Sequence, residues 1–381
     1  MEKVIINGQI VLETGIIWDG VLVVEDGIIK KIGDMREFEI PEDAEIIDAG
    51  GAYVGPGFVD IHVHGGSGYN SYEEPEKAAA HFLKHGETTM LVTPSYTLNF
   101  DKMLSGIRAA RKAMRTTKNI KGIYMEGPYT NPDYGSHAYS NPWRSSTNPE
   151  EYKQLVDEGG TDIKVWTVAP ERPDLVSFLE YARKVNPDVV FALGHSEATP
   201  EQIRGLGKYQ PTLMTHFLNA TGRAMGDSGG LRGYGPDEYC FAKKDMYAEL
   251  ISDSFGIHVH AELQRMVLKN KGIERVVLIT DSTAYNNNTP EHLAHIDDLS
   301  FGEHGELAGS KLTMDKVCRN IMRSTSCGIA QAFIMGSLNP ARVIGMDDKI
   351  GSIEPGKLAD LVFVDDKFNV KKVMQEGEIY E

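Results

Sequence analysis

Short apolar runs recur along the middle of the chain and alternate with segments of helical character. Eight runs are rich in β-branched and aliphatic residues, as expected for strands buried on both faces: 58–64, 88–93, 120–126, 163–168, 189–195, 212–216, 247–252 and 275–281. Amphipathic segments between them include 75–85, 100–116, 174–185 and 260–271. Eight strand–helix units over residues 57–345 predict an α/β protein with a (β/α)8 TIM-type barrel, and a doubly wound open sheet is the structural alternative.

Both ends of the chain show a different pattern. The first 56 residues contain short β-branched runs at 4–8, 9–12, 21–27 and 28–32, with the turn pairs Asn7-Gly8 and Asp26-Gly27 among them. The last residues contain similar runs at 359–365, 370–374 and 377–380. We therefore predict a small β-sandwich domain built from residues 1–56 and 346–381, beside a barrel of residues 57–345.

Composition narrows the classes of partner. A formal net charge of −16 argues against nucleic acid or an anionic membrane surface, although a few basic residues would suffice to hold one phosphate group. The three cysteines lack the paired spacing of a disulfide framework or a thiolate metal site. No apolar run reaches the length of a signal peptide core or a membrane span, so we expect a cytoplasmic protein.

Polar residues that can bind metal ions close five of the eight runs. They are His62, His64, Glu126, His195, His216 and Asp281. Side chains two residues apart in a strand point the same way, so His62 and His64 project together. In a barrel, the carboxyl ends of all strands meet at one mouth. A lone histidine is more often a hydrogen-bonded core residue, but four histidines and two carboxylates at strand ends predict a divalent-metal site.

The ligand types indicate the kind of metal and the reaction. Imidazole and carboxylate without thiolate suit zinc, iron, manganese or cobalt. Of these metals we expect zinc first. Two ligand groups that share one carboxylate would hold one or two ions per subunit: His62, His64 and Glu126, and Glu126, His195 and His216. A metal ion lowers the pKa of its water and polarises a carbonyl group. Asp281 is then placed to accept the water's proton and return it to a leaving amine, which describes amide hydrolysis.

Longer segments carry a resemblance that extends over essentially the whole chain. PGFVDIHVHG at 56–65 and GSIEPGKLAD at 351–360 resemble the amidohydrolase superfamily. EGP at 126–128, THFLNA at 215–220 and LAGSKLTMD at 307–315 are similar to the N-acetylglucosamine-6-phosphate deacetylases within it. The resemblance implies a homodimeric, metal-dependent hydrolase that converts N-acetylglucosamine 6-phosphate to glucosamine 6-phosphate and acetate, through attack by metal-activated hydroxide.

Carried over position by position, the resemblance also implies residue roles. It implies metal ligation by Glu126, His195 and His216, with Asp281 as general base. Some relatives replace the first-strand histidines by amides and hold one metal, so keeping both implies the two-metal kind. His137 matches a histidine that contacts the acetamido group and helps stabilise the developing oxyanion. Further substrate contacts are implied for Asn219, Ala220, His258 and Leu307.

One stretch departs from the family pattern. After the Asn-Ala pair, the deacetylases usually carry a phosphate-binding arginine in a Gly-Arg-Glu-Pro-Gly segment, often across a dimer interface. This chain instead has TGRAMGDSGGLR at 221–232, where Arg223 comes before the expected position, Arg232 after it, and Asp227 near it. Either the loop is re-routed and Arg223 or Arg232 binds phosphate, or the substrate is unphosphorylated or differently substituted.

Two further hypotheses stay open. The same chemistry could act on a galacto-configured sugar or on another N-acyl amide, such as an N-acyl amino acid, a dipeptide or a cyclic amide. Alternatively, the chain is a catalytically silent barrel that binds sugar as a sensor or scaffold. Loss of a site residue would be expected in a silent barrel, whereas the whole set of predicted ligands and the base is intact here.

Overall fold

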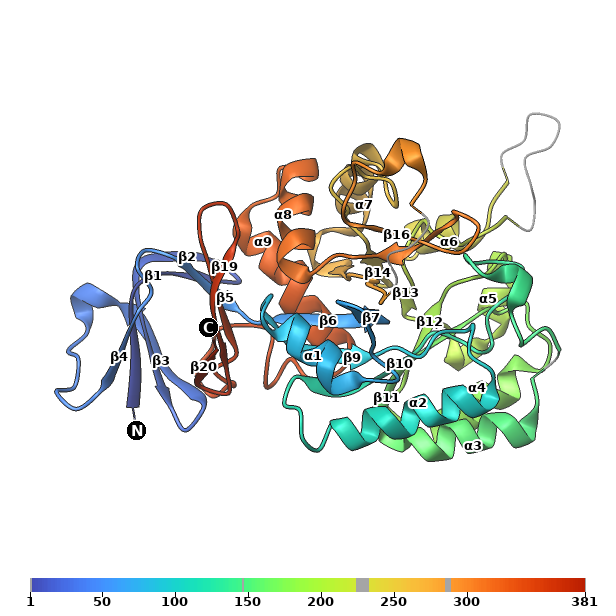
Figure 1. Ribbon diagram of the computed structural model, residues 1–381, viewed down its shortest axis with the longest axis horizontal. Helices are drawn as coiled ribbons and strands as arrows, with labels where there is room; N and C mark the ends of the chain where they lie inside the picture. The colour runs from blue at the N-terminus through green and yellow to red at the C-terminus, as the bar shows by residue number, and fades with distance from the viewer. Residues whose placement is uncertain (1, 146, 224–232, 285–288, 381) are drawn as a thin grey trace.

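A parallel eight-stranded sheet forms the larger part of the computed structural model, which describes all residues except 1, 146, 224–232, 285–288 and 381 (Figure 1). Its strands follow chain order: β6 (Phe58–Val63), β9 (Glu87–Val92), β10 (Ile120–Met125), β11 (Ile163–Val168), β12 (Val190–Leu193), β13 (Leu213–Met214), β14 (Tyr247–Leu250) and β15 (Val276–Leu278). Each strand corresponds to one predicted run. Sequential order excludes the doubly wound alternative, whose strand order reverses at a switch point.

Helices lie outside this sheet, between its strands in sequence or after the last of them. They are α1 (Pro75–Leu83), α2 (Phe100–Ala113), α3 (Pro149–Gly159), α4 (Leu175–Val185), α5 (Pro200–Gly205), α6 (Pro236–Ala242), α7 (Ala261–Lys271), α8 (Met314–Thr325), α9 (Ile329–Phe333), the π-helical η7 (Ile334–Leu338) and α10 (Asn339–Val343). The four predicted helices correspond to α1, α2, α4 and α7. Helix α2 begins where the Asn99 side chain accepts from the Lys102 N–H, 3.0 Å away. Among the described residues, none of the helices combines the length and hydrophobicity that a membrane-spanning segment requires.

The first and last barrel strands are joined by the segment that follows β15. The Asp281 N–H donates to the His62 carbonyl oxygen at 3.0 Å, and the His64 N–H donates to the Ser282 carbonyl oxygen at 2.9 Å. The Thr280 hydroxyl also donates to the Asp60 carboxylate at 2.5 Å. These bonds close the seam between β6 and β15 without a regular ladder. The predicted barrel is thereby confirmed as a nearly closed, eight-stranded parallel sheet.

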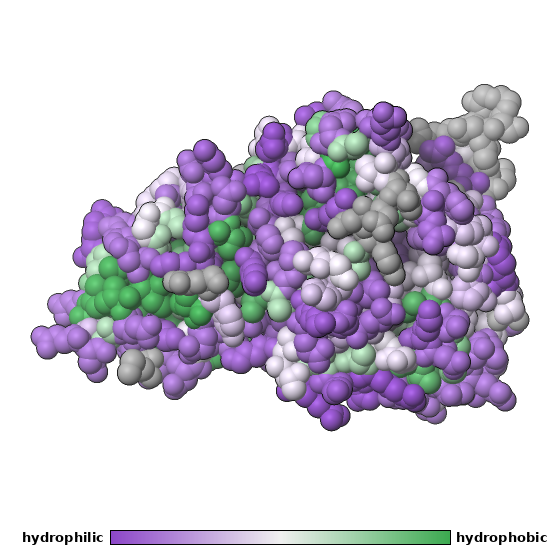
Figure 2. Space-filling view, in the orientation of Figure 1, coloured by the Kyte–Doolittle hydropathy of each residue, from purple (hydrophilic) through white to green (hydrophobic). Residues whose placement is uncertain are grey.

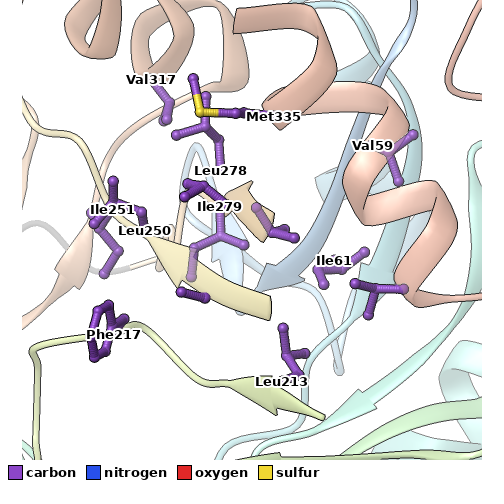
Figure 3. Packing of buried hydrophobic residues seen from close by; sticks show 14 of the residues in the cluster. Val59, Ile61, Leu213, Phe217, Leu250, Ile251, Leu278, Ile279, Val317 and Met335 are labelled. Atoms are coloured by element: carbon purple, nitrogen blue, oxygen red, sulfur yellow. The ribbon is translucent and has the colours of Figure 1, made fainter. Parts of the chain in front are cut away.

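Strand β6 shows how alternation sorts polar and apolar side chains. Val59 and Ile61 are fully buried in a hydrophobic cluster that also contains Leu278 of β15. Figure 3 shows part of this cluster, with Val317 of α8 and Met335 of η7 next to Leu278. The side chains between them in sequence point to the opposite face, which is the inside of the barrel. The apolar face therefore anchors β6 under the helices and directs its histidines inward.

Strands from both termini form a second sheet, on the left of Figure 1. Its order is β20 (Glu378–Tyr380), β19 (Val370–Gln375), β18 (Leu361–Val364), β5 (Tyr53–Pro56), β1 (Glu2–Leu12), β2 (Gly15–Glu25) and β3 (Ile28–Asp34), and β4 (Glu45–Asp48) pairs with β1. Many of its buried residues make one hydrophobic cluster, whereas Val11, Val362 and Val364 belong to the cluster that includes barrel residues. Figure 2 shows a hydrophobic patch over this terminal sheet, whereas hydrophilic residues dominate the rest of the visible face. The two chain ends thus assemble together, as predicted.

Two turn pairs in this sheet behave differently. Asp26-Gly27 forms the predicted hairpin turn between β2 and β3, with φ angles of 51° and 76°. The turn predicted at Asn7-Gly8 is wrong, because β1 continues through it. Asn7 has a φ of 56°, and the register with β2 slips between Ile5 and Gly8. The pair therefore makes a β-bulge that bends one long strand rather than a reversal.

Candidate metal centre and active site

All six predicted metal-site residues meet at the carboxyl end of the barrel. They come from five strand ends: His62 and His64 from β6, Glu126 after β10, His195 after β12, His216 after β13 and Asp281 after β15. Each has at most 9% of its surface exposed. The barrel geometry therefore brings together side chains that are widely separated in the sequence.

Glu126 lies at the centre of this group. Its Oε1 is 2.8 Å from His195 Nε2 and 3.2 Å from His216 Nε2, while its Oε2 is 3.3 Å from His64 Nε2. Two groups of three possible metal ligands share it, each with its ligand atoms within 4.8 Å of one another: His62, His64 and Glu126, and Glu126, His195 and His216. These are the two groups predicted from the sequence.

The hydrogen bonds of the remaining ring nitrogens favour metal binding. Three of the four histidines direct Nδ1 at an oxygen that can only accept: His62 at Glu249 Oε2 (3.0 Å), His64 at the Thr93 carbonyl (2.9 Å) and His195 at the Tyr134 carbonyl (3.2 Å). A proton on Nδ1 leaves the Nε2 lone pair free to coordinate a metal ion. His62 Nε2 is buried without a hydrogen-bond partner. The donor set therefore fits a divalent metal.

Electrostatics within the cluster also favour a cation. Burial alone would raise the pKa of Glu126, but the surrounding histidines, His195 foremost, hold it well below its usual range. The pKa of Asp281 is likewise lowered against the effect of burial, mainly by its contact with His64. Burial lowers the pKa of His64, yet Glu126 and Asp281 outweigh it and raise the value to about 9. Both carboxylates thus stay ionised, which is the form in which a carboxylate binds a metal ion.

Three of the six residues adopt a left-handed backbone. The φ angles of His195, His216 and Asp281 are 45°, 26° and 46°. Residues with a side chain seldom occupy this region, and such strain concentrates at functional sites, where the surrounding structure imposes it. The His216 N–H bonds to the Glu249 side chain at 3.0 Å. The strand β13 ends earlier than predicted.

A cavity of about 960 Å³ opens above the ligand groups. Its wall includes five residues predicted to contact substrate: His137, Asn219, Ala220, His258 and Leu307. Arg223, the sixth, is not in the wall, and its Nε lies 3.3 Å from Glu238 Oε1. Arg232 and Asp227, which the sequence also singled out, fall outside the described residues. Lys102 is the one lysine or arginine among the described wall residues.

Glu249 is a site residue that sequence reasoning missed. It lies on β14, is fully buried, and its Oε2 accepts both from His62 Nδ1 and from the His216 N–H, each at 3.0 Å. One carboxylate thus contacts a residue from each ligand group. The sequence signal was an acid inside the apolar run 247–252. Because Glu249 does not end its run, the position of ligands at strand ends does not identify it.

We expect Glu249→Gln to weaken metal binding by about 10- to 100-fold. With its oxygen at the Oε2 position the amide can still accept both bonds, but it lacks the negative charge that makes the His62 ring a stronger ligand. Metal content after dialysis against a weak chelator measures the effect. Glu87→Gln is the matched control, because Glu87 is also fully buried on a barrel strand but bonds to the Met314 N–H at 2.7 Å, away from the ligands. Equal metal retention in both variants would contradict this role.

Comparisons with known proteins agree with this geometry. Residues 53–380 match the model of the amidohydrolase family. The N-acetylgalactosamine-6-phosphate deacetylase of Escherichia coli O157:H7 is 28% identical, over 100% of this chain and 99% of that protein. The N-acetylglucosamine-6-phosphate deacetylase structure from Pasteurella multocida superposes with a TM-score of 0.86 at 26% identity, with 100% of both chains covered. A mutant of the Mycobacterium smegmatis enzyme, in complex with N-acetyl-D-glucosamine-6-phosphate, gives a TM-score of 0.82 at 26% identity, with 99% of both covered.

Proposed function

The chain belongs to the amidohydrolase family, and we propose that it removes the acetyl group from an N-acetylamino sugar, N-acetylglucosamine 6-phosphate first among them. The products are glucosamine 6-phosphate and acetate. The observation that carries the proposal is the convergence of two three-ligand groups on Glu126, with Asp281 beside them, at a cavity large enough to admit a sugar. Similarity to deacetylases over the full length of the chain supports the substrate class.

The two ligand groups would hold one or two divalent ions, with zinc expected first and iron, manganese or cobalt as alternatives. When bound, such an ion lowers the pKa of water and polarises the acetyl carbonyl. In the proposed reaction, the Asp281 carboxylate takes the proton from the attacking water. It then delivers this proton to the sugar nitrogen as the C–N bond breaks, so that acetate and a free amine leave. Asp281 Oδ1 lies 3.4 Å from His64 Nε2, at the edge of the first ligand group.

The cavity wall would bind and orient the sugar. His137 is proposed to donate a hydrogen bond to the acetyl oxygen, where negative charge develops. The other proposed contacts are Asn219, Ala220, His258 and Leu307. His258 is suited to this role because Asp253 holds its Nδ1 at 3.1 Å while its Nε2 is buried without a hydrogen-bond partner.

The cavity wall gives support to a second candidate substrate, which differs from the first in lacking the phosphate group. The described cavity wall contains Glu73, Glu303 and Glu306 but one lysine, Lys102, and carboxylates repel a phosphate dianion. This arrangement favours an unphosphorylated N-acetyl sugar. Participation of Arg223 or Arg232 in a phosphate site, from the same or a neighbouring subunit, would favour the 6-phosphate.

An acetate-release assay tests the function and separates these substrates. The panel consists of N-acetylglucosamine 6-phosphate, N-acetylgalactosamine 6-phosphate and the two unphosphorylated sugars. We expect the highest kcat/KM on N-acetylglucosamine 6-phosphate. A preference for the free sugars would support the second candidate, and activity on none of the four would refute the sugar assignment.

We also propose the organisation of the whole enzyme. Residues 1–56 and 346–381 would form a small β-sandwich domain, and residues 57–345 the catalytic barrel. A hydrophobic cluster that includes Ile5, Leu22 and Phe363 and, among the described residues, no residue of a barrel strand supports this division. We further propose that the enzyme is a cytoplasmic homodimer. Light scattering on the purified protein gives its molecular mass and so tests whether it is a dimer.

A further inference from the structure

A chain of three polar side chains lines the cavity wall beside the ligand groups. The Tyr96 hydroxyl lies 3.4 Å from Ser136 Oγ, which in turn lies 2.8 Å from His137 Nδ1. All three residues face the cavity. The ring of Tyr96 packs on His195, with centroids 4.6 Å apart. The chain therefore connects the floor of the site to the histidine proposed to contact the acetyl group.

The loop that carries Ser136 and His137 can approach this closely because of Gly135. Its φ is +117°, and a side chain there would collide with the Tyr96 hydroxyl and with His195 Nδ1. The same loop accepts a hydrogen bond from His195 Nδ1 at the Tyr134 carbonyl, 3.2 Å away. The position of Ser136 is thus fixed from two sides.

The direction of the hydrogen bonds follows from the donor inventory. A tyrosine hydroxyl carries its proton at neutral pH and has one hydrogen to donate. Tyr96 is only 4% exposed, and within the described chain Ser136 is the acceptor available to it. A serine that accepts from Tyr96 has its own hydrogen free for the next group. The nearest polar atom to receive that hydrogen is His137 Nδ1, 2.8 Å away, and an accepting Nδ1 satisfies it.

We propose that Tyr96 and Ser136 are positioning residues that hold His137 in the tautomer with its proton on Nε2. Neutral imidazole carries one proton, so an accepting Nδ1 makes Nε2 a donor. The opposite tautomer would present a lone pair at Nε2 and repel the acetyl oxygen. The identity of that oxygen rests on the proposed function. The tautomer of His137 does not depend on it.

Nitrogen NMR of the zinc-loaded enzyme with ¹⁵N-labelled histidines reads the tautomer without any substrate. The signals of His137 are identified as those missing from His137→Gln. We expect Nδ1 to resonate as an unprotonated acceptor and Nε2 as a protonated nitrogen. A proton on Nδ1 would overturn the proposal. Because acetate release is measured separately, an inactive enzyme with the expected tautomer would refute only the proposed function.

Three variants test whether the hydrogen bonds from Tyr96 through Ser136 to His137 matter for catalysis. Tyr96→Phe removes the hydroxyl and keeps the ring on His195, while Ser136→Ala breaks the chain at its centre. We expect both variants to lower kcat by about tenfold with little change in KM. This loss in kcat is smaller than the roughly 10²-fold or greater loss produced by removal of a donor to an oxyanion. Ser136→Thr should restore kcat, because it returns the hydroxyl. The proposal would also be refuted if Ser136→Thr did not restore kcat and Ser136→Ala left the His137 signals unchanged.

Ser140→Ala is the matched control for these variants. Ser140 lies on the same loop, but its hydroxyl donates to the His137 backbone carbonyl at 3.3 Å rather than to the ring. We expect its kcat and its His137 signals to match the wild type. A loss equal to that of Ser136→Ala would show that general loosening of the loop, and not the tautomer, governs activity. If Ser136→Ala fails to fold, the wild-type tautomer and Tyr96→Phe still decide the question.

Discussion

Asp281→Asn should lower kcat by about 10²- to 10⁴-fold, because an amide cannot accept the proton that the reaction must move. Asparagine keeps the size of the side chain, and the Asp281 N–H bond to the His62 carbonyl at 3.0 Å belongs to the backbone. The variant should therefore fold normally and retain its metal. Acetate release under saturating substrate measures kcat, and elemental analysis measures metal content.

The control for this variant is Asp315→Asn. Asp315 is equally buried, at 8% exposure, but lies near the start of α8, where it contacts Thr313 at 2.5 Å and His85 at 3.5 Å. We expect it to change stability and to leave kcat near the wild-type value. Substantial turnover by Asp281→Asn with full metal content would eliminate Asp281 as the base.

Glu126→Gln should weaken metal binding at both proposed ligand groups, because Glu126 is the one residue common to them. A metal ion supplies several kcal/mol of transition-state stabilisation, so we expect kcat/KM to fall by about 10³-fold or more. By contrast, the double variant His62→Gln/His64→Asn alters only the first group. It should keep one ion and measurable activity.

Elemental analysis and thermal unfolding with added zinc separate these outcomes. Ligands that bind only the folded state raise Tm by an amount that grows with their affinity. Zinc should therefore stabilise the double variant and have little effect on Glu126→Gln. The assignment of residues to the two ligand groups would be wrong if Glu126→Gln retained two ions or if the double variant retained none.

Much of the fold was predictable from the sequence because buried parallel strands leave a strong local signal. Runs such as 58–64 and 163–168 are largely apolar, and all eight runs became barrel strands. The Asn7-Gly8 pair was misjudged for a physical reason. Its local preference for a positive φ is satisfied equally by a turn or by a bulge, and pairing with β2 decides between them.

The ligand groups were predictable for a different reason. A barrel brings all strand ends to one mouth, so polar residues at those ends could be grouped before any distance was known. Glu249 and Ser136 could not be found this way, because neither ends a strand. Their proposed roles depend on which atom of a histidine ring they contact, at 3.0 Å and 2.8 Å, and that information exists only in three dimensions.

The seam between β6 and β15 also has a consequence for how the enzyme matures. Asp281 and His62 come from opposite ends of the barrel's chain, and backbone hydrogen bonds across the seam set their spacing. A nascent polypeptide that has emerged as far as Leu250 already contains all four histidines and Glu126, yet it lacks the partner strand that supplies Asp281. The proposed ligands and the proposed base therefore come together only after β15 has been made and its end has bonded to β6. The seam makes closure of the barrel a condition for the proposed chemistry.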